Sequence, residues 1–259
     1  HTSYSDGAGL PRMVDAAANA GLDAIGFTDH CSVDGARREE RLLWNRNFDQ
    51  TYERRREALA VAADRAPEVT VYDGVEMDYA PAAATAIESF LETAGFDYAI
   101  GSVHYVGGRH AFPFESFADD GDAARDAFVD AYYDAVVSLA ESDLFDVLGH
   151  VDLIEDHPAL RGRTTDAHRR RVAAACAETG TVPEINAGRT GDSGEFDDLH
   201  PASPFVETFR DHGVPFVVGT DAHDPGDFTG RLDRPDRLLA TTGIEPLPLS
   251  AAVGESSPA

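Results

Sequence analysis

Two kinds of segment alternate along almost the whole chain, and this alternation constrains the fold more than any other feature. Short runs rich in β-branched and aromatic residues are separated by longer stretches rich in Ala, Arg and Glu. Because parallel strands need long crossover connections that are usually helical, the pattern predicts a parallel sheet covered by helices. The expected strands are 24–30, 69–79, 96–105, 144–154, 181–189 and 215–224. The expected helices are 11–21, 52–66, 83–95, 122–142, 164–180 and 203–213.

Almost every expected strand ends on a side chain that can bind a metal ion. A lone histidine at a strand end is more often a capping or core residue, but a repeated occurrence in one chain is hard to explain in that way. The C-terminal ends of parallel barrel strands meet at one face, and Zn²⁺, Mn²⁺ and Fe²⁺ accept imidazole nitrogens and carboxylate oxygens. A glutamate among histidines can bridge two ions, so we expect a multinuclear site. The residues are His30, Glu76, His104, His150, Asp221 and His223.

The charge balance is strongly acidic and limits the possible partners. The chain carries 47 acidic and 21 basic residues, a net charge of −26, and all of its basic residues are arginine. Such a surface repels itself unless salt screens it, as in cytoplasmic proteins of salt-accumulating halophiles, and it disfavours binding to nucleic acid. The arginine runs at 54–56 and 169–171 are expected on solvated helix faces.

The remaining composition favours a cytoplasmic protein without membrane contact. No stretch approaches the ~18 apolar residues of a membrane span. The two cysteines, Cys31 and Cys176, lie far apart, which is typical of a reducing compartment rather than of a disulfide framework. The oligomeric state stays open.

Several motifs together resemble the PHP (polymerase and histidinol phosphatase) family of metal-dependent phosphoesterases. The resemblance covers roughly residues 1–235 and is strongest to the histidinol-phosphatase branch. It is carried by HTSYSDG at 1–7, TDHC at 28–31, GVEMDY at 74–79, FDYAIGSVHY at 96–105, FDVLGHVDLI at 145–154, EINAGR at 184–189 and GTDAHDP at 219–225.

The resemblance implies an α/β fold, a distorted (β/α)7 barrel in one domain over 1–244, with a loose tail at 245–259. Members of the family begin on a strand that carries H-x-H-T-x-Y-S-D-G. His1 is therefore expected to be the second histidine of a pair, with the first strand truncated before it. Six expected strands and this one give the seven of the family.

The same resemblance implies two to three divalent metal ions, of Zn, Mn or Fe. These ions act as Lewis acids for phosphate oxygens and activate water near neutral pH. The implied ligand sets are His1, Glu76 and Asp221 for one ion, Glu76, His104 and His150 for a second, and Asp6, His30 and His223 for a third.

The implied activity is hydrolysis of a small phosphate ester, most closely L-histidinol phosphate in histidine synthesis. Glu76, Asp221 and His223 are the expected catalytic residues among the ligands. No G-x-S-x-G elbow or phosphate-binding loop supports a covalent mechanism. Two alternatives stay open. One is a different sugar phosphate or nucleotide as substrate; the other is a non-catalytic or proofreading PHP partner of a DNA polymerase, against which the intact ligand set argues.

Three further side chains are expected near the substrate. Arg189 is expected to bind the phosphate as a catalytic residue, because a guanidinium donates two parallel hydrogen bonds. The alternative is an ordinary surface arginine. Arg109 and His110 follow the fourth motif on a loop that could cover the substrate or be solvated. The residues expected to orient ligands or substrate are Asp29, Asp78, Asp152, Glu184 and Asn186. The histidines interpreted as ordinary surface residues are His157, His168, His200 and His212.

Overall fold

The parallel sheet is at the centre of the molecule. A computed structural model describes residues 1–43, 47–112, 117–189 and 199–253. Six strands pair in the order β1-β2-β3-β6-β7-β8, and every neighbouring pair is parallel. The expected strands are thereby confirmed, although all but the first are shorter than their apolar runs. The strands are β1 Ala24–Cys31, β2 Thr70–Asp78, β3 Tyr98–Ser102, β6 Val147–Leu148, β7 Val182–Asn186 and β8 Val217–Gly219.

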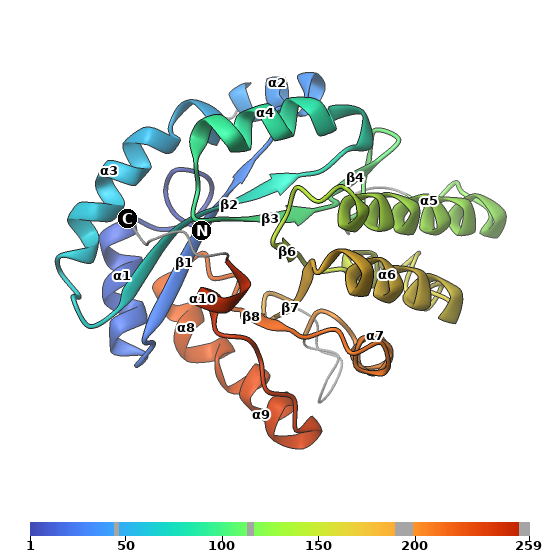
Figure 1. The fold of residues 1–259 in the computed structure, drawn as a ribbon. Helices are drawn as coiled ribbons and strands as arrows, with labels where there is room; N and C mark the ends of the chain where they lie inside the picture. Colours follow the sequence, from blue (N-terminus) through green and yellow to red (C-terminus); the bar gives the residue numbers. More distant parts are fainter. Residues whose placement is uncertain (44–46, 113–116, 190–198, 254–259) are drawn as a thin grey trace.

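Helices cover the outer side of this curled sheet (Figure 1). The expected helices are confirmed. The structure also contains α2, α8, α9 and α10, which the sequence pattern does not predict. The helices are α1 Leu10–Asn19, α2 Gly35–Leu43, α3 Tyr52–Ala63, α4 Ala84–Ala94, α5 Asp122–Glu141, α6 Asp166–Thr179, α7 Ser203–Asp211, α8 Pro225–Arg231, α9 Asp233–Thr242 and α10 Leu249–Ala252. Short 3-10 turns lie at Phe48–Gln50, Pro81–Ala83 and Leu153–Asp156.

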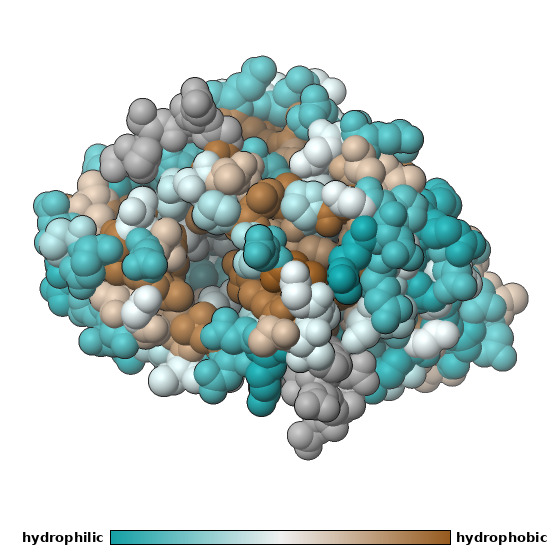
Figure 2. Space-filling model, turned by 60° about the horizontal axis from the view of Figure 1, so that its bottom comes forward, coloured by the Kyte–Doolittle hydropathy of each residue, from teal (hydrophilic) through white to brown (hydrophobic). Residues whose placement is uncertain are grey.

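The expected α/β fold is confirmed. The strands that the structure describes form a curled parallel sheet, which is part of a barrel. Among the described residues, β1 and β8 are its two edge strands, and a cavity of about 340 Å³ is lined by residues of both. The expected strand before His1 lies outside the sequence. Figure 2 shows hydrophilic residues around most of one face of the molecule, with hydrophobic residues gathered near its middle.

A hairpin follows β3 and was not expected from the sequence. Its strands are β4 Tyr105–Val106 and β5 Arg109–His110, which pair antiparallel. Gly107 and Gly108 join them with φ of 59° and 81°. Positive φ at both central residues defines the tight turn that matches strand twist, and glycine adopts it without a steric penalty. The hairpin brings His110 back toward the end of β3.

Several surface expectations are wrong. Arg55 of the 54–56 run is fully buried, since its guanidinium pairs with carboxylates beneath the helix. His157, His168 and His200 are also buried, whereas His212 is exposed as expected. The expectation of a loose tail from 245 is too broad, because Leu247 N donates to Phe216 O and Val253 is buried. Residues 254–259 lie outside the described residues.

Two further features concern the cysteines and the helices. Cys31 and Cys176 are free and buried. None of the described helices is long and apolar enough to cross a membrane.

Candidate metal centre

A cavity of about 700 Å³ opens at the C-terminal ends of the strands. All of the expected metal ligands come together at this end of the sheet. His30 and Glu76 lie within β1 and β2, where they are paired in register, and the others follow their strands closely or belong to the loop before α1. The ligands that line the cavity are Asp6, His30, His104, His150, Asp221 and His223. His1 and Glu76 are buried and line the cavity of about 340 Å³.

Glu76 is at the centre of the cluster. Its Oε2 atom lies 3.0 Å from His30 Nδ1 and 3.4 Å from His1 Nε2. Its Oε1 atom lies 3.1 Å from His150 Nε2 and 3.4 Å from His104 Nε2. Each carboxylate oxygen therefore faces a different pair of imidazoles. This is the arrangement in which one carboxylate bridges two cations.

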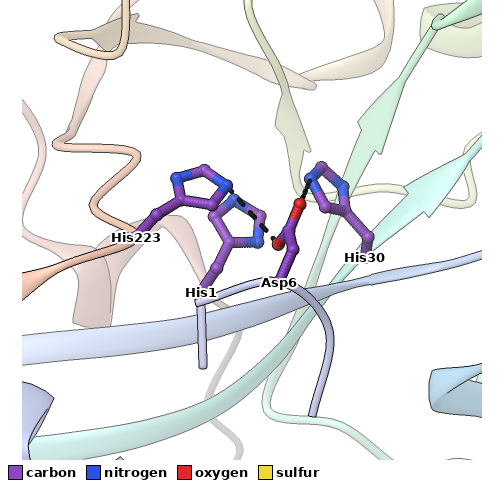
Figure 3. A group of neighbouring side chains, drawn as sticks. All are labelled: His1, Asp6, His30 and His223. Atoms are coloured by element: carbon purple, nitrogen blue, oxygen red, sulfur yellow. Dashed lines mark ion pairs between the residues drawn. The ribbon is translucent and has the colours of Figure 1, made fainter. Parts of the chain in front are cut away.

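Two aspartates complete the cluster on either side. His1 Nε2 lies 2.9 Å from Asp221 Oδ1. Asp6 lies between two imidazoles, with Oδ1 3.5 Å from His223 Nε2 and Oδ2 3.8 Å from His30 Nε2 (Figure 3). Both aspartates thus offer oxygens to histidines from different strands. The three expected ligand sets are each brought together by these contacts.

The donor atoms fit divalent metal ions. One ligand atom from each of His1, Asp6, His30 and His223 lies within 4.8 Å of the others, and the same holds for His30, Glu76 and His104. The His1 ring stacks on His30 and His223, with centroids 4.3 and 4.1 Å away. Nδ1 of His150 is buried and has no hydrogen-bond partner among the described residues. Imidazole and carboxylate donors at this density are the set that Zn²⁺, Mn²⁺ or Fe²⁺ accepts.

The pKa values of the cluster show how strongly the site favours positive charge. Burial alone would lower the pKa of His1, but the hydrogen bond and charge of Asp221, with Glu76 and Asp6, raise it to about 10. Burial likewise opposes the positive charge on His150, yet Glu76 raises its pKa to about 9. The carboxyl pKa values of Glu76 and Asp221 are lowered by the imidazoles despite burial. In metal-free protein, protons on His1 and His150 therefore supply positive charge that metal ions would supply when bound.

Two acidic residues hold ligands from behind, as expected. Asp78 accepts a hydrogen bond from His104 Nδ1 and is bound by Arg41 through Nε at 3.1 Å and Nη2 at 2.8 Å. Glu184 Oε1 accepts from the His150 backbone N–H at 3.0 Å and from Asn186 Nδ2 at 2.7 Å. The Asp78 contact fixes the ring orientation of His104, whereas Glu184 holds the backbone of His150.

Arg189 lies in a buried ion-pair network beside the cavity rather than in its wall. Its Nε donates to Asp156 Oδ1 at 2.7 Å and its Nη1 to Leu199 O at 2.9 Å, while Nη2 is 3.2 Å from Asp152 Oδ1. His200 Nδ1 is 2.6 Å from the same Asp152 oxygen. Of these residues, Asp156 and His200 line the cavity.

His200 is the main site residue that sequence analysis missed. Burial opposes its positive charge, but Asp152 and Asp156 raise its pKa, and the pKa values of both aspartates are lowered in turn. The signal in the sequence was weak because His200 lies in a loop and reaches the site through a bridge to Asn186.

The expected substrate loop contributes one of its two residues. His110 lines the cavity and is buried, and burial with the nearby His104 lowers its pKa to about 3. The structure does not bring Arg109 to the cavity wall; its guanidinium lies over Phe117 and pairs with Asp120 at 2.8 Å. The wall also contains residues from α2 and beyond that sequence analysis did not single out. These are Arg37, Glu40, Arg41, Tyr105, Phe112, Leu153 and Arg231.

Similarity to known proteins agrees with this geometry. A family model for the PHP domain matches residues 1–187. A protein of Deinococcus radiodurans described as a probable histidinol-phosphatase is 31% identical over 220 residues, which is 85% of this chain and 82% of that protein.

Two solved structures share the fold. Histidinol phosphate phosphatase from Lactococcus lactis, complexed with zinc, L-histidinol and phosphate, has a TM-score of 0.73 at 20% identity and covers 95% of this chain and 93% of its own. The putative histidinol phosphatase of Listeria monocytogenes has a TM-score of 0.68 at 17% identity, with 88% and 92% covered.

Proposed function

The chain belongs to the PHP domain family, and we propose that it is a metal-dependent phosphatase that hydrolyses L-histidinol phosphate to L-histidinol and phosphate. The observation that carries this proposal is Glu76, whose two oxygens face four imidazoles at 3.0 to 3.4 Å. A buried carboxylate so surrounded is suited to joining cations. The similarity to a probable histidinol-phosphatase supports the substrate.

Two to three divalent ions, of Zn, Mn or Fe, would be held by the cluster. His1, Glu76 and Asp221 would hold one, Glu76, His104 and His150 a second, and Asp6, His30 and His223 a third. Bound ions would supply Lewis-acid charge to phosphate oxygens and a nucleophile from water at neutral pH. Asp78 would keep the His104 ring in the orientation that ion binding needs, and Glu184 would hold the backbone of His150 in place.

The cavity wall suits both halves of the substrate. The phosphate end carries close to two negative charges, and Arg37, Arg41 and Arg231 are among the residues that line the cavity. The histidinol end carries an imidazole ring and an ammonium group. Tyr105 and Phe112 offer aromatic surface to the ring. Glu40 and Asp156 are acidic residues of the same wall and would favour the ammonium group.

Arg189 would act on the substrate directly or through its partners. Its guanidinium nitrogens donate to Asp156 and Leu199 and lie against Asp152. A direct phosphate contact would require some of these bonds to exchange. The arrangement favours an indirect role, in which Arg189 holds Asp156 and His200 at the cavity wall.

Phosphate release from a panel of esters tests the proposal. The panel would contain histidinol phosphate, a sugar phosphate and a nucleoside monophosphate, each assayed with added Zn²⁺, Mn²⁺ or Fe²⁺. We expect histidinol phosphate to have the highest kcat/KM. Asp221→Asn should abolish most of the activity, whereas Asp233→Asn, which neutralises an exposed aspartate of α9, should not. A higher kcat/KM for another ester would show that histidinol phosphate is not the substrate. Absence of phosphate release from every ester of the panel would contradict the proposal.

A further inference from the structure

The loop before α1 supplies two candidate ligands but has little secondary structure of its own. These are His1, at its start, and Asp6. Between them, Thr2 O accepts from the backbone N–H of Ser5 at 3.1 Å and of Gly7 at 2.8 Å, which folds the loop into a tight turn. The Thr2 side chain is fully buried and Ser5 nearly so. Something beneath the loop must therefore satisfy their polar groups.

Asp29 provides those partners. Its Oδ1 atom accepts from Thr2 N at 2.6 Å and from Ser5 Oγ at 2.7 Å. Its Oδ2 atom accepts from Thr2 Oγ1 at 2.7 Å and from Arg55 Nη1 at 3.2 Å. Asp29 is fully buried, and each of its oxygens takes two donors. It immediately precedes His30 in β1, so one strand carries a ligand and anchors the loop that carries two more.

Arg55 compensates the charge of Asp29 and extends the network to β2. This arginine of α3 is fully buried, and its Nη1 also donates to Phe27 O at 2.8 Å. Its Nη2 donates to Asp73 and to Gly74 O, and Asp73 belongs to the strand that carries Glu76. A buried guanidinium between two buried carboxylates is stable only while its partners stay in place.

We propose that Asp29 and Arg55 are positioning residues for the metal centre. They lock the loop of His1 and Asp6 onto the strands of His30 and Glu76, so that ligands from three segments keep a common geometry before any ion binds. The inference rests on the metal centre of the proposed function. It is distinct from a role in folding alone, because its loss should weaken ion binding even where the fold persists.

Thr2 separates these two roles. Thr2→Val removes one hydroxyl while the charges of Asp29 and Arg55 remain, and Thr2→Ser keeps the hydroxyl. Asp29→Asn places an amide group where four donors now converge, which is the stronger change. The matched control is Tyr133→Phe, which removes a buried hydroxyl bonded to Thr164 Oγ1 at 2.8 Å, between α5 and the segment before α6.

The experiment measures the Zn²⁺ affinity of metal-free protein by competition with a chromophoric chelator, together with Tm. We expect Thr2→Val and Asp29→Asn to lower the affinity by about 10- to 100-fold, the usual effect of removing a group that orients metal ligands. Thr2→Ser and Tyr133→Phe should bind Zn²⁺ as wild type does, although Tyr133→Phe should lower Tm. If Thr2→Val binds Zn²⁺ as wild type does, the positioning role is wrong. If wild type binds no Zn²⁺, the proposed function fails first.

Discussion

Oε1 of Glu76 lies 3.1 Å from Nε2 of His150, although the two residues are 74 positions apart in the chain. The same carboxylate turns its other oxygen to His30, 3.0 Å away. Glu76 belongs to β2, His30 to the neighbouring β1, and His150 follows β6 beyond β3. One carboxylate thereby connects candidate ligands from across the sheet.

Glu76→Gln should therefore be more damaging than any single change outside the ligand set. The amide keeps the shape of the side chain but removes the negative charge and replaces one acceptor with a donor. We expect loss of bound metal and a decrease in kcat/KM of at least about 100-fold. Elemental analysis and phosphate-release kinetics measure both, with Glu88→Gln on the exposed face of α4 as control. Wild-type metal content and rate in Glu76→Gln would exclude a bridging role.

Metal binding should release protons. In metal-free protein the pKa of His1 is about 10 and that of His150 about 9, so both rings are protonated at pH 7.5. An ion can bind those nitrogens only after the protons leave, so about two protons should be released and the affinity should fall as the pH falls. Calorimetry of Zn²⁺ binding in buffers of different ionisation enthalpy measures the number. An enthalpy independent of the buffer would mean that these rings do not bind the ion.

Arg189→Ala should affect both stability and activity while the metal ligands stay in place. Its removal leaves the buried Asp152 with His200 as its remaining partner, and losing one partner of a buried ion pair costs at most about 3–5 kcal/mol. We also expect kcat/KM on histidinol phosphate to fall, because Asp156 and His200 at the cavity wall lose the guanidinium that holds them. Arg189→Lys should recover only part, because an ammonium lacks the planar fork. Kinetics and urea unfolding of both variants measure these changes. Equal kcat/KM values for wild type, Arg189→Ala and Arg189→Lys would show that Arg189 has no role in the reaction.

The strand-end ligands could be predicted from sequence because their positions follow from local rules. A parallel sheet places the C-terminal ends of its strands at one face, so His104 and His150 converge without any knowledge of their contacts. The prediction that His1 and Asp6 are ligands rested on the family resemblance, because neither residue follows an expected strand. The structure brings all of them to one cluster.

Burial within the arginine and histidine segments could not be predicted in this way. Arg54, Arg55 and Arg56 have the same helical context, and Arg55 and Arg56 both pair with Asp73. Arg55 is the one that is fully buried and also pairs with Asp29, and this depends on how α3 packs on two strands. His200 reaches Asp152 across 48 positions of sequence. Both cases depend on long-range pairing between charged groups, which leaves no periodic pattern in a single sequence.

High salt should stabilise the protein. Surface pairs such as Arg171 with Asp134 would be weakened by salt, but 47 acidic against 21 basic residues leave repulsion as the larger effect. The Debye length shortens from about 10 Å at 0.1 M to about 3 Å at 1 M ionic strength, which screens that repulsion. We expect Tm to rise between dilute buffer and molar KCl. A Tm that stays constant or falls would contradict an adaptation to salt.

Hydrolysis of the phosphate ester should depend on the ions held around Glu76. The most direct test measures phosphate release from histidinol phosphate before and after removal of metal by chelation and dialysis, with metal content determined on the same samples. We expect metal-free protein to be inactive while still folded, and activity to return in proportion to the Zn²⁺, Mn²⁺, Fe²⁺ or Co²⁺ that is bound again. Full activity in protein shown to contain no metal would contradict the account.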